Sequence, residues 1–461
     1  MKATTRFLKR LGCLALAAVL SLACLSACGG EGGGGKTKLK VFLYMNDHEK
    51  EVYTAMVEKF KEEHKDEVSD IEFQITTQSE YATTLTGMMT AKDMPDVFYV
   101  GPERVKDYVS NGYVANLTPL LSEAGISTDD LPQGILSFYR YDGAQTGSGD
   151  LYALPKDASV FAYAYNKDVF DAAGVAYPDP GKPYTYDEYV QVLQALTKDT
   201  NGDGEIDQWG ASFADTYMLY QFLWSNGASF TSADGKTVTV SDPKFVDALQ
   251  KYVDLTLKYQ VTPTVEQDTA LGPYQRWIAG QTGFYAAGTW DVASFMDPET
   301  FPYNWDLCYY PTLSSGKSVT WSGTVGFCVS ETSEHKDLAL KLISYLSTDP
   351  EGQKDLSGMN GSASVQVPNL LSLQDEFKSK VADGSVNYPD NVDVIFNYLN
   401  GSDTAEGRMM ETTYTPNTEW IDIFWEQLTD VKAGKRDLNE FITSIEPEMQ
   451  EKLDKAWSTA G

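Results

Sequence analysis

Hydrophobic and polar positions follow two different periods in the first part of the chain. Short apolar runs at 40–44, 71–75 and 96–100 are rich in β-branched and aromatic residues and are bounded by polar or turn residues, which predicts strands. Between the first two runs, apolar residues recur at helical spacing over 52–60, and 81–90 predicts a further helix. Strands that alternate with helices are typical of a sheet covered by helices. We therefore predict an α/β fold.

Helical periodicity returns later in the chain, separated by turn-rich stretches. The predicted helices are 186–196, 243–259, 336–346 and 418–431, and the turn-rich stretches are 143–149 and 178–183. A chain of 461 residues fits two or three domains at a prior of about 150 residues each. After the N-terminal segment, no stretch reaches the roughly 18 uninterrupted apolar residues of a membrane-spanning helix.

The N-terminal segment has the layout of an export signal. Basic residues in the first ten positions precede an apolar run from Leu11, and the run closes on small residues before Cys28. We predict a lipoprotein signal peptide at 1–27, with Cys28 as the lipidated first mature residue, and a flexible glycine-rich tether at 28–37. The protein is then expected on the outer face of the cell membrane, held by its lipid, and the long glycine tether favours a host with one membrane over a host with two. The alternative is a soluble secreted protein with a chance cysteine.

Charge and aromatic content narrow the class of ligand. Asp and Glu outnumber Lys and Arg by 66 to 36, and the formal net charge is −30. Such a surface repels nucleic acid and anionic lipid headgroups, so we expect no nucleic-acid partner and a neutral ligand. The 9 Trp, 28 Tyr and 20 Phe supply many flat amphipathic faces, which suits sugar binding, although core packing is the default role of such residues.

Cysteine and histidine give little sign of chemistry. Cys308 and Cys328 both lie in apolar strand-like runs, where they form either a bridge between neighbouring strands or two buried free thiols, and we favour the free thiols. His48, His64 and His335 are scattered along the chain, so no histidine-based metal cluster or Ser-His-Asp arrangement stands out.

The segment 199–207 matches the first nine positions of a calcium loop. The oxygen ligands would come from Asp199, Asn201, Asp203, Glu205 through its backbone carbonyl, and Asp207. Position 12 is Gly210 in place of the usual bidentate Glu, so Gln208 or water would complete the shell. We predict a structural Ca²⁺ site and no catalytic cofactor. The alternative is an Asx-rich turn without an ion.

Four ordered blocks of sequence resemble one family. The blocks are 94–99 with 111–117, 151–155 with 165–170 and 184–188, 283–290, and 326–330 with 349–353. In this order they are similar to motifs of the family 1 extracellular solute-binding proteins, the maltose-binding-protein class that serves ABC importers. The resemblance implies two discontinuous α/β lobes, joined by hinge strands, that close on a ligand. It places lobe 1 at 38–155 and 314–350 and lobe 2 at 156–313 and 351–461.

The resemblance also implies candidate sugar-binding residues in lobe 1. Asn46 and Asp47 follow the first strand, and Glu103 and Arg104 lie shortly after the 94–99 block, where relatives hold sugar hydroxyls. Carboxylates and Arg forks are suited to hydroxyl rims.

In lobe 2 the implied candidates include aromatic rings. Asp215 aligns with a carboxylate, Tyr217 with a stacking ring, and Trp290 and Trp420 with a stacking pair. Val100 and Ser159 stand where some relatives have a cleft Trp and Glu, and Asp157 is the candidate to replace the latter. These departures argue against maltose itself.

Three functions remain to be weighed. The resemblance favours a non-enzymatic, monomeric receptor that captures a carbohydrate and delivers it to an ABC permease in the membrane. A secreted polysaccharide-degrading enzyme would need two opposed carboxylates about 5 to 10 Å apart, and no catalytic signature accompanies the family blocks. A surface adhesin without a transporter is the third reading.

Overall fold

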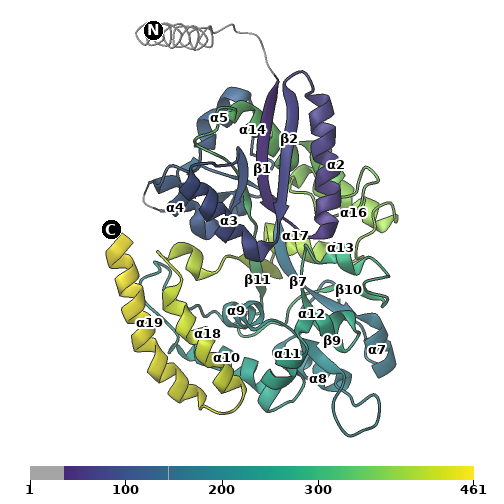
Figure 1. The fold of residues 1–461 in the computed structure, drawn as a ribbon. Coiled ribbons are helices and arrows are strands. Elements are labelled where there is room, and N and C mark those ends of the chain that lie inside the picture. The colour runs from purple at the N-terminus through teal and green to yellow at the C-terminus, as the bar shows by residue number, and fades with distance from the viewer. Residues whose placement is uncertain (1–35, 144, 461) are drawn as a thin grey trace, which may run out of the picture.

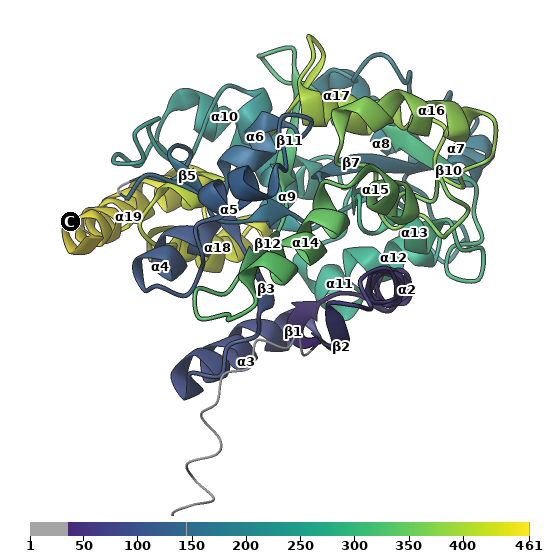
Figure 2. The same cartoon turned by 90° about the horizontal axis from the view of Figure 1, so that it is seen from above.

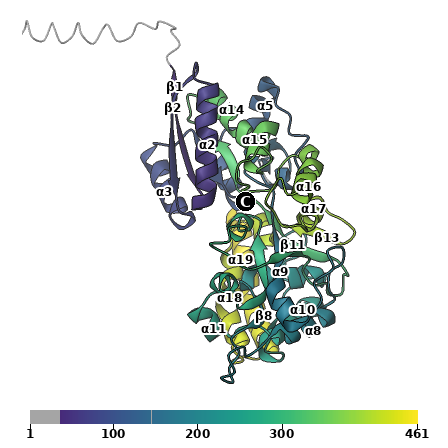
Figure 3. The same cartoon turned by 90° about the vertical axis from the view of Figure 1, so that its right-hand side faces the viewer.

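Two β-sheets, each covered by helices, organise the chain into two lobes (Figure 1). The computed structural model describes residues 36–143 and 145–460, so the predicted signal peptide, Cys28 and most of the tether lie outside the described residues. In the views of Figures 1 and 3 one lobe lies above the other. The upper one, called lobe 1 below, holds the first strands of the chain, and the lower one, lobe 2, holds the C-terminal helices.

The sheet of lobe 1 has the strand order β2-β1-β3-β12-β6. Its strands are β1 (Thr37–Tyr44), β2 (Val68–Thr76), β3 (Val97–Val100), β6 (Leu154–Pro155) and β12 (Gly326–Val329). The first three are parallel, and β12 and β6 are antiparallel to their neighbours. The other elements are α2 (Asp47–Glu63), α3 (Gln78–Ala91), η1 (Pro102–Arg104), α4 (Val105–Ser110), α5 (Leu117–Ala124), α6 (Gln133–Ser137), β4 (Arg140–Tyr141), β5 (Asp150–Leu151), α14 (Lys336–Ser347), α15 (Pro350–Leu356) and η2 (Leu371–Leu373).

The sheet of lobe 2 is built around β7 (Ser159–Asn166), which is buried along its whole length. Its partners are β8 (Trp209–Ser212), β9 (Thr282–Gly288), β10 (Trp305–Cys308), β11 (Ser318–Gly323) and β13 (Ala405–Arg408). The order is β13-β11-β7-β9-β8, and β10 also pairs with β7. The helices are α7 (Lys167–Ala173), α8 (Tyr186–Leu196), α9 (Asp215–Ser225), α10 (Pro243–Leu257), α11 (Val265–Ala270), α12 (Pro273–Ile278), α13 (Val292–Phe295), α16 (Gln374–Ala382), α17 (Asp393–Asn400), η3 (Glu411–Tyr414), α18 (Glu419–Lys432) and α19 (Leu438–Ala460).

The flanks of the molecule differ. Helices α18 and α19 lie on one side, and α16 and α7 lie on the opposite side in both views (Figures 1 and 2). Figure 3 shows α16 and α17 at the level where the lobes join. No helix in the described part of the chain is long and apolar enough to cross a membrane.

The chain passes between the sheets through short connections. β6 ends at Pro155 in the first sheet and β7 begins at Ser159 in the second, and β11 ends at Gly323 just before β12 begins at Gly326. β11 therefore belongs to the second sheet, although the predicted division gives 314–350 to lobe 1. Helix α15 packs on α14 and α2 of lobe 1, although the predicted division gives it to lobe 2.

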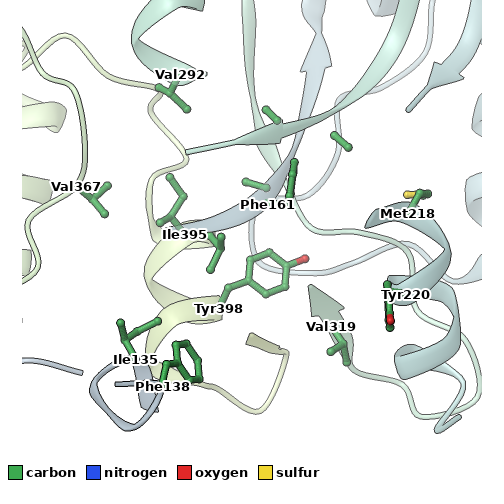
Figure 4. Close-up of a cluster of buried hydrophobic side chains, with 14 of the residues drawn as sticks. Ile135, Phe138, Phe161, Met218, Tyr220, Val292, Val319, Val367, Ile395 and Tyr398 are labelled. Carbon is green, nitrogen blue, oxygen red and sulfur yellow. The ribbon is translucent and has the colours of Figure 1, made fainter. Parts of the chain in front are cut away.

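The core confirms the main sequence patterns. The apolar positions at helical spacing before Phe60 are the buried face of α2, and α8, α10, α14 and α18 match the predicted helices to within a few residues. Figure 4 shows that Phe161 of β7, Tyr398 of α17 and Ile135 of α6 gather in one buried cluster. Cys308 and Cys328 are free and buried, as favoured from the sequence.

Candidate functional site

Lobe 1 brings a buried ion network to the joint between the lobes. The Lys156 ammonium lies 2.5 Å from Glu49 Oε1 and 2.9 Å from Asp157 Oδ2, and all three residues are buried. Burial alone would lower the pKa of Lys156, but the charges of Asp157 and Glu49 outweigh it and hold that pKa well above its usual range. Because each buried charge has an opposite partner, the network fixes the start of α2 against the connection between β6 and β7.

Tyrosine side chains surround this network. Tyr44, at the end of β1, is half-buried, and burial raises its pKa to about 12, against the opposing effect of Lys156. Glu103 is near enough to raise the same pKa further. The Tyr53 hydroxyl donates a hydrogen bond to Gln366 Oε1 at 3.2 Å. The contribution of lobe 1 to the joint is therefore made of hydroxyls and charges.

Lobe 2 presents a group of four aromatic rings, called the aromatic platform below: Phe161, Tyr217, Trp290 and Trp321. Phe161 is the buried centre, with its ring centroid 4.2 Å from that of Tyr217, 5.1 Å from Trp290 and 5.7 Å from Trp321. The two indoles lie edge to face at 5.9 Å. The three outer rings are only partly buried, so each keeps part of its surface open to a ligand.

Two glycines leave room for the indole rings of the platform. A Cβ at Gly288 would come within 2.3 Å of the Trp290 ring, and a Cβ at Gly323 within 2.3 Å of the Trp321 ring. Each Trp lies two residues from its glycine and folds back over it. Because no side chain other than hydrogen fits there, these glycines fix where the indoles lie.

Asp291 is a carboxylate of lobe 2 whose pKa depends in part on a charge in lobe 1. It follows Trp290, is half-buried, and accepts a hydrogen bond from the Gly288 amide on Oδ2 at 3.2 Å. Burial raises its pKa to about 7, the Gly288 amide opposes this, and the charge of Glu49 in lobe 1 raises it further. A charge of lobe 1 therefore contributes to the raised pKa of a carboxylate in lobe 2.

A cavity of about 340 Å³ is lined by residues of both lobes. Its walls come from His48 at the start of α2, from α13 and Asp297 of lobe 2, and from the segments 358–364 and 384–387. Its volume falls at the lower end of the roughly 300–1,000 Å³ range of small-molecule sites.

The structure brings some of the predicted binding residues together and not others. Tyr217 and Trp290 lie in the aromatic platform, and Asp157 lies in the ion network. Asn46 is the N-cap of α2 and exchanges hydrogen bonds with Glu49, so its carboxamide oxygen already accepts the Glu49 amide.

The remaining lobe 1 candidates are exposed at the rim. Asp47 lies in the first turn of α2, and Glu103 and Arg104 lie in η1, which contacts η3 of lobe 2. As exposed side chains they remain candidates for contact with a ligand.

Two lobe 2 candidates have structural partners. Asp215 accepts hydrogen bonds from the Tyr252 hydroxyl and the Lys432 ammonium, which ties α9 to α10 and α18. Trp420 is fully buried in lobe 2, and its indole nitrogen donates to Thr415 Oγ1 at 3.0 Å. Its burial contradicts the predicted stacking role, because neither ring face is open to a ligand.

The loop 199–207 is held by its own backbone. Asp199 accepts the amides of Gly202 and Gly204 at 2.6 and 2.8 Å, and these bonds lower its pKa. Asp203 accepts the amide of Glu205 at 2.9 Å. Within residues 36–143 and 145–460, this loop included, no three Asp, Glu, His or Cys side chains converge in a way that holds a metal. In this arrangement the loop is an Asx-rich turn, and calcium binding stays a prediction from the sequence.

Several residues of the site were missed from the sequence: Glu49, Lys156, Phe161, Asp291 and Trp321. The sequence holds one signal for Trp321. Residues 321–323 read Trp-x-Gly, which is the reverse of the Gly-x-Trp pattern at 288–290. The buried ion network gives no local signal, since Glu49 lies more than a hundred residues before Lys156 and Asp157.

Comparison of the sequence with known proteins identifies a family and a relative. The family described as bacterial extracellular solute-binding protein matches residues 46–353. The diacetylchitobiose binding protein DasA of Streptomyces coelicolor is 25% identical over 322 residues, which cover 68% of this chain and 69% of that protein.

Two solved structures share the two-lobed fold, and the predicted fold class is confirmed. An ABC substrate-binding protein of Listeria monocytogenes, in complex with cycloalternan, superposes with a TM-score of 0.74 at 20% identity, over 91% of this chain and 100% of that one. UgpB of Mycobacterium tuberculosis, in complex with glycerophosphocholine, gives 0.72 at 16% identity, over 91% and 99%. Because the family match spans more than half of its length, the chain belongs to the bacterial extracellular solute-binding proteins.

Proposed function

We propose that this protein is a receptor that captures a carbohydrate between its lobes and delivers it to an ABC-type importer. The observation that carries the proposal is the aromatic platform of lobe 2, which lies beside the hydroxyl- and charge-bearing side chains of lobe 1. As a member of its family the chain is a binding protein and not an enzyme. The ligands named for DasA and for the Listeria protein are both carbohydrates, which supports the same class of ligand here.

The platform and the polar face match the two surfaces of a sugar ring. A pyranose has an apolar C–H face, which stacks on an indole, and a rim of hydroxyls, which accept and donate hydrogen bonds. One ring that buries about 80 Å² contributes about 2 kcal/mol at ~25 cal/mol/Å². A Kd near 1 μM corresponds to about −8 kcal/mol. Trp290 and Trp321 together would therefore supply a large part of the binding free energy.

The negative charge of the site argues for an uncharged ligand. The charge of Glu49 raises the pKa of Asp291, and the whole chain carries a net charge of −30. An anionic solute such as a phosphorylated sugar would be repelled by this charge. A neutral sugar meets no such repulsion.

A glycan array followed by calorimetry tests the proposal. We expect saturable binding of at least one neutral oligosaccharide, a change in tryptophan fluorescence, and recovery of the sugar intact by chromatography. A phosphorylated sugar, which carries a net negative charge, serves as the contrasting ligand and should bind at least tenfold more weakly. Failure of every carbohydrate to bind, or release of a shorter sugar, would overturn the proposal.

The proposal includes a lipid anchor and a monomeric state. The sequence before the described residues supports a lipid anchor at Cys28 on the extracellular side of a cell membrane. Metabolic labelling with a palmitate analogue, compared between the full-length protein and Cys28→Ser, tests it: label on the variant would exclude this site. Gel filtration with light scattering tests the expected monomer.

A further inference from the structure

One row of residues crosses four neighbouring strands of the lobe 2 sheet. Gly288 of β9 pairs with Phe161 of β7. The register of β7 with β11 places Trp321 beside Phe161, and their ring centroids lie 5.7 Å apart. On its other side, β11 pairs Trp321 with Arg408 of β13. Because paired residues of neighbouring strands point to the same face of a sheet, Arg408 extends the aromatic platform by one strand.

Strand β13 lies close against β11 at this point. Figure 3 shows β13 beside β11 and α17. A Cβ at Gly407, the residue before Arg408, would lie 2.6 Å from the Ser322 Cβ, so glycine is what permits this approach. Paired strands are about 4.8 Å apart. An arginine side chain is longer than this spacing, so the Arg408 guanidinium can reach the edge of a sugar ring that stacks on Trp321.

The Arg408 guanidinium is anchored on one side and free on the other. Its Nε donates to Glu406 Oε1, and the Lys317 ammonium donates to Glu406 Oε2 at 3.0 Å. Burial would raise the pKa of Glu406, but the bonds from Lys317 and Arg408 outweigh it and lower that pKa. Within the described part of the chain, Nη1 and Nη2 of Arg408 have no partner, and the side chain is 44% exposed. Glu406 therefore fixes the guanidinium and leaves its two outer donor groups open beside the platform.

We propose that Arg408 is a specificity-determining residue, whose Nη1 and Nη2 groups donate to two adjacent hydroxyl oxygens of the sugar unit that stacks on Trp321. This inference rests on the proposed function and narrows it to ligands whose stacked unit carries an adjacent pair of free hydroxyls. The planar guanidinium engages two neighbouring oxygens at once, which the single ammonium of lysine does not. Because Glu406 already balances the charge of Arg408, the free donors suit neutral hydroxyls.

The competing reading is that Arg408 serves only its ion pair with Glu406. Exposed pairs of this kind contribute little to stability, and a lysine at position 408 would keep the charge that faces Glu406. Under that reading, exchange of the guanidinium for an ammonium leaves ligand affinity unchanged. The two readings therefore differ in what Arg408→Lys does to binding.

Calorimetry on Arg408 variants tests the contact. The probe is whichever of maltotriose, cellotriose, α-1,5-arabinotriose and triacetylchitotriose binds the wild-type protein most tightly, or the tightest sugar of the glycan array if none of them binds. Arg408→Lys and Arg408→Gln should each weaken binding of the probe at least tenfold. Arg436→Lys is the matched control, because it makes the same change in lobe 2 at a side chain that donates to Gln427 and Ser444, and it should bind within twofold of wild type. Thermal melts confirm that each variant is folded.

Monodeoxy analogues of the probe, each lacking one hydroxyl, show whether the guanidinium touches the sugar. In the wild-type protein, removal of either hydroxyl of one adjacent pair should weaken binding at least fivefold. In Arg408→Gln the same analogues should bind within twofold of the parent sugar, because the donors to those hydroxyls are gone. Coupling of this kind is expected for groups in contact and not for distant ones.

A loss smaller than tenfold in either folded Arg408 variant overturns the contact and leaves the receptor function standing. The same conclusion follows if the control loses as much, or if the deoxy losses persist unchanged in Arg408→Gln. Absence of binding by the four probes and by every sugar on the glycan array overturns the proposed function and this inference together.

Discussion

The two lobes meet the joint with opposite kinds of surface. Lobe 1 offers the ion network of Glu49, Lys156 and Asp157, whose charges are buried and paired. Lobe 2 offers the aromatic platform, whose outer rings have no such partners and stay partly open. The first surface is committed to holding the protein together, and the second is free to hold a ligand. Substitutions in the ion network should therefore affect stability, and substitutions in the aromatic platform should affect affinity.

The largest loss of stability from a residue at the joint is expected for Lys156→Met. It leaves Glu49 and Asp157 buried side by side without their cation, and breaking a buried pair in this way costs about 3–5 kcal/mol of unfolding free energy. Urea denaturation measures the loss. Lys59→Met is the control, because that ion pair with Asp355 is partly exposed and should change stability by about 1 kcal/mol or less. A loss for Lys156→Met no larger than that of the control would contradict the structural role of lobe 1.

Two tryptophans of lobe 2 are expected to differ in role, one in core packing and the other in ligand binding. Trp420→Ala should cost about 3–5 kcal/mol of stability, as expected for a large core ring. Trp290→Ala should change the melting temperature little and weaken sugar binding at least tenfold, about 1.4 kcal/mol. Calorimetry and thermal melts on both variants give the comparison. Unchanged affinity in Trp290→Ala would remove this ring from the site.

Asp291 gives the joint a dependence on pH. Its pKa in the folded protein is about 7, above the ordinary value of 3.8, so between these values the folded state binds more protons than the unfolded state. The contribution of Asp291 to stability is therefore present at low pH and is lost as pH rises through about 7. Asp291→Asn, which stays neutral, should gain stability relative to wild type between pH 4 and pH 8, as measured by melts.

The exposed Asp297 provides the comparison for this effect. Asp297→Asn, which removes an exposed carboxylate from the same lobe, is the matched control. Burial also raises the pKa of Asp268 to about 6. Asp268 is present in the wild type and in both variants, so its contribution to stability cancels when each variant is compared with the wild type. Parallel pH profiles for wild type and Asp291→Asn would show that Asp291 ionises as it does in water.

The smallest effect is expected at the loop 199–207. If calcium binds there, EDTA should lower the melting temperature by about 2–4 °C, the shift that ~1 kcal/mol gives in a large domain. Added CaCl₂ should restore it in the wild type and not in Asp199→Asn. No shift, with no metal by elemental analysis, would leave only the Asx-rich turn.

The elements with strong local periodicity were predictable from sequence. The apolar face of α2 and the bounds of α8 follow directly from residue spacing, because a helix that packs on a sheet needs one continuous apolar stripe. The lobe division was harder, since β11 lies in the second sheet and β12, only a few residues later, in the first. Spacing along the chain does not reveal which sheet a buried strand joins.

The candidate site was predictable only in part. Trp290 and Tyr217 were found through their motif positions, and both lie in the platform. Trp420 has the same chemistry in a helix with an apolar face, and only the tertiary packing shows that it is buried. The pairing of Lys156 with Glu49, more than a hundred residues apart, depends on the fold and not on any local pattern.

A crystal structure with the tightest oligosaccharide from the array tests the central claim most directly. The account predicts one intact sugar between the lobes, with a ring face on Trp290 or Trp321 and hydroxyls toward the lobe 1 face around Tyr44 and Glu103. A sugar bound away from the joint, or a shortened product within it, would contradict the account.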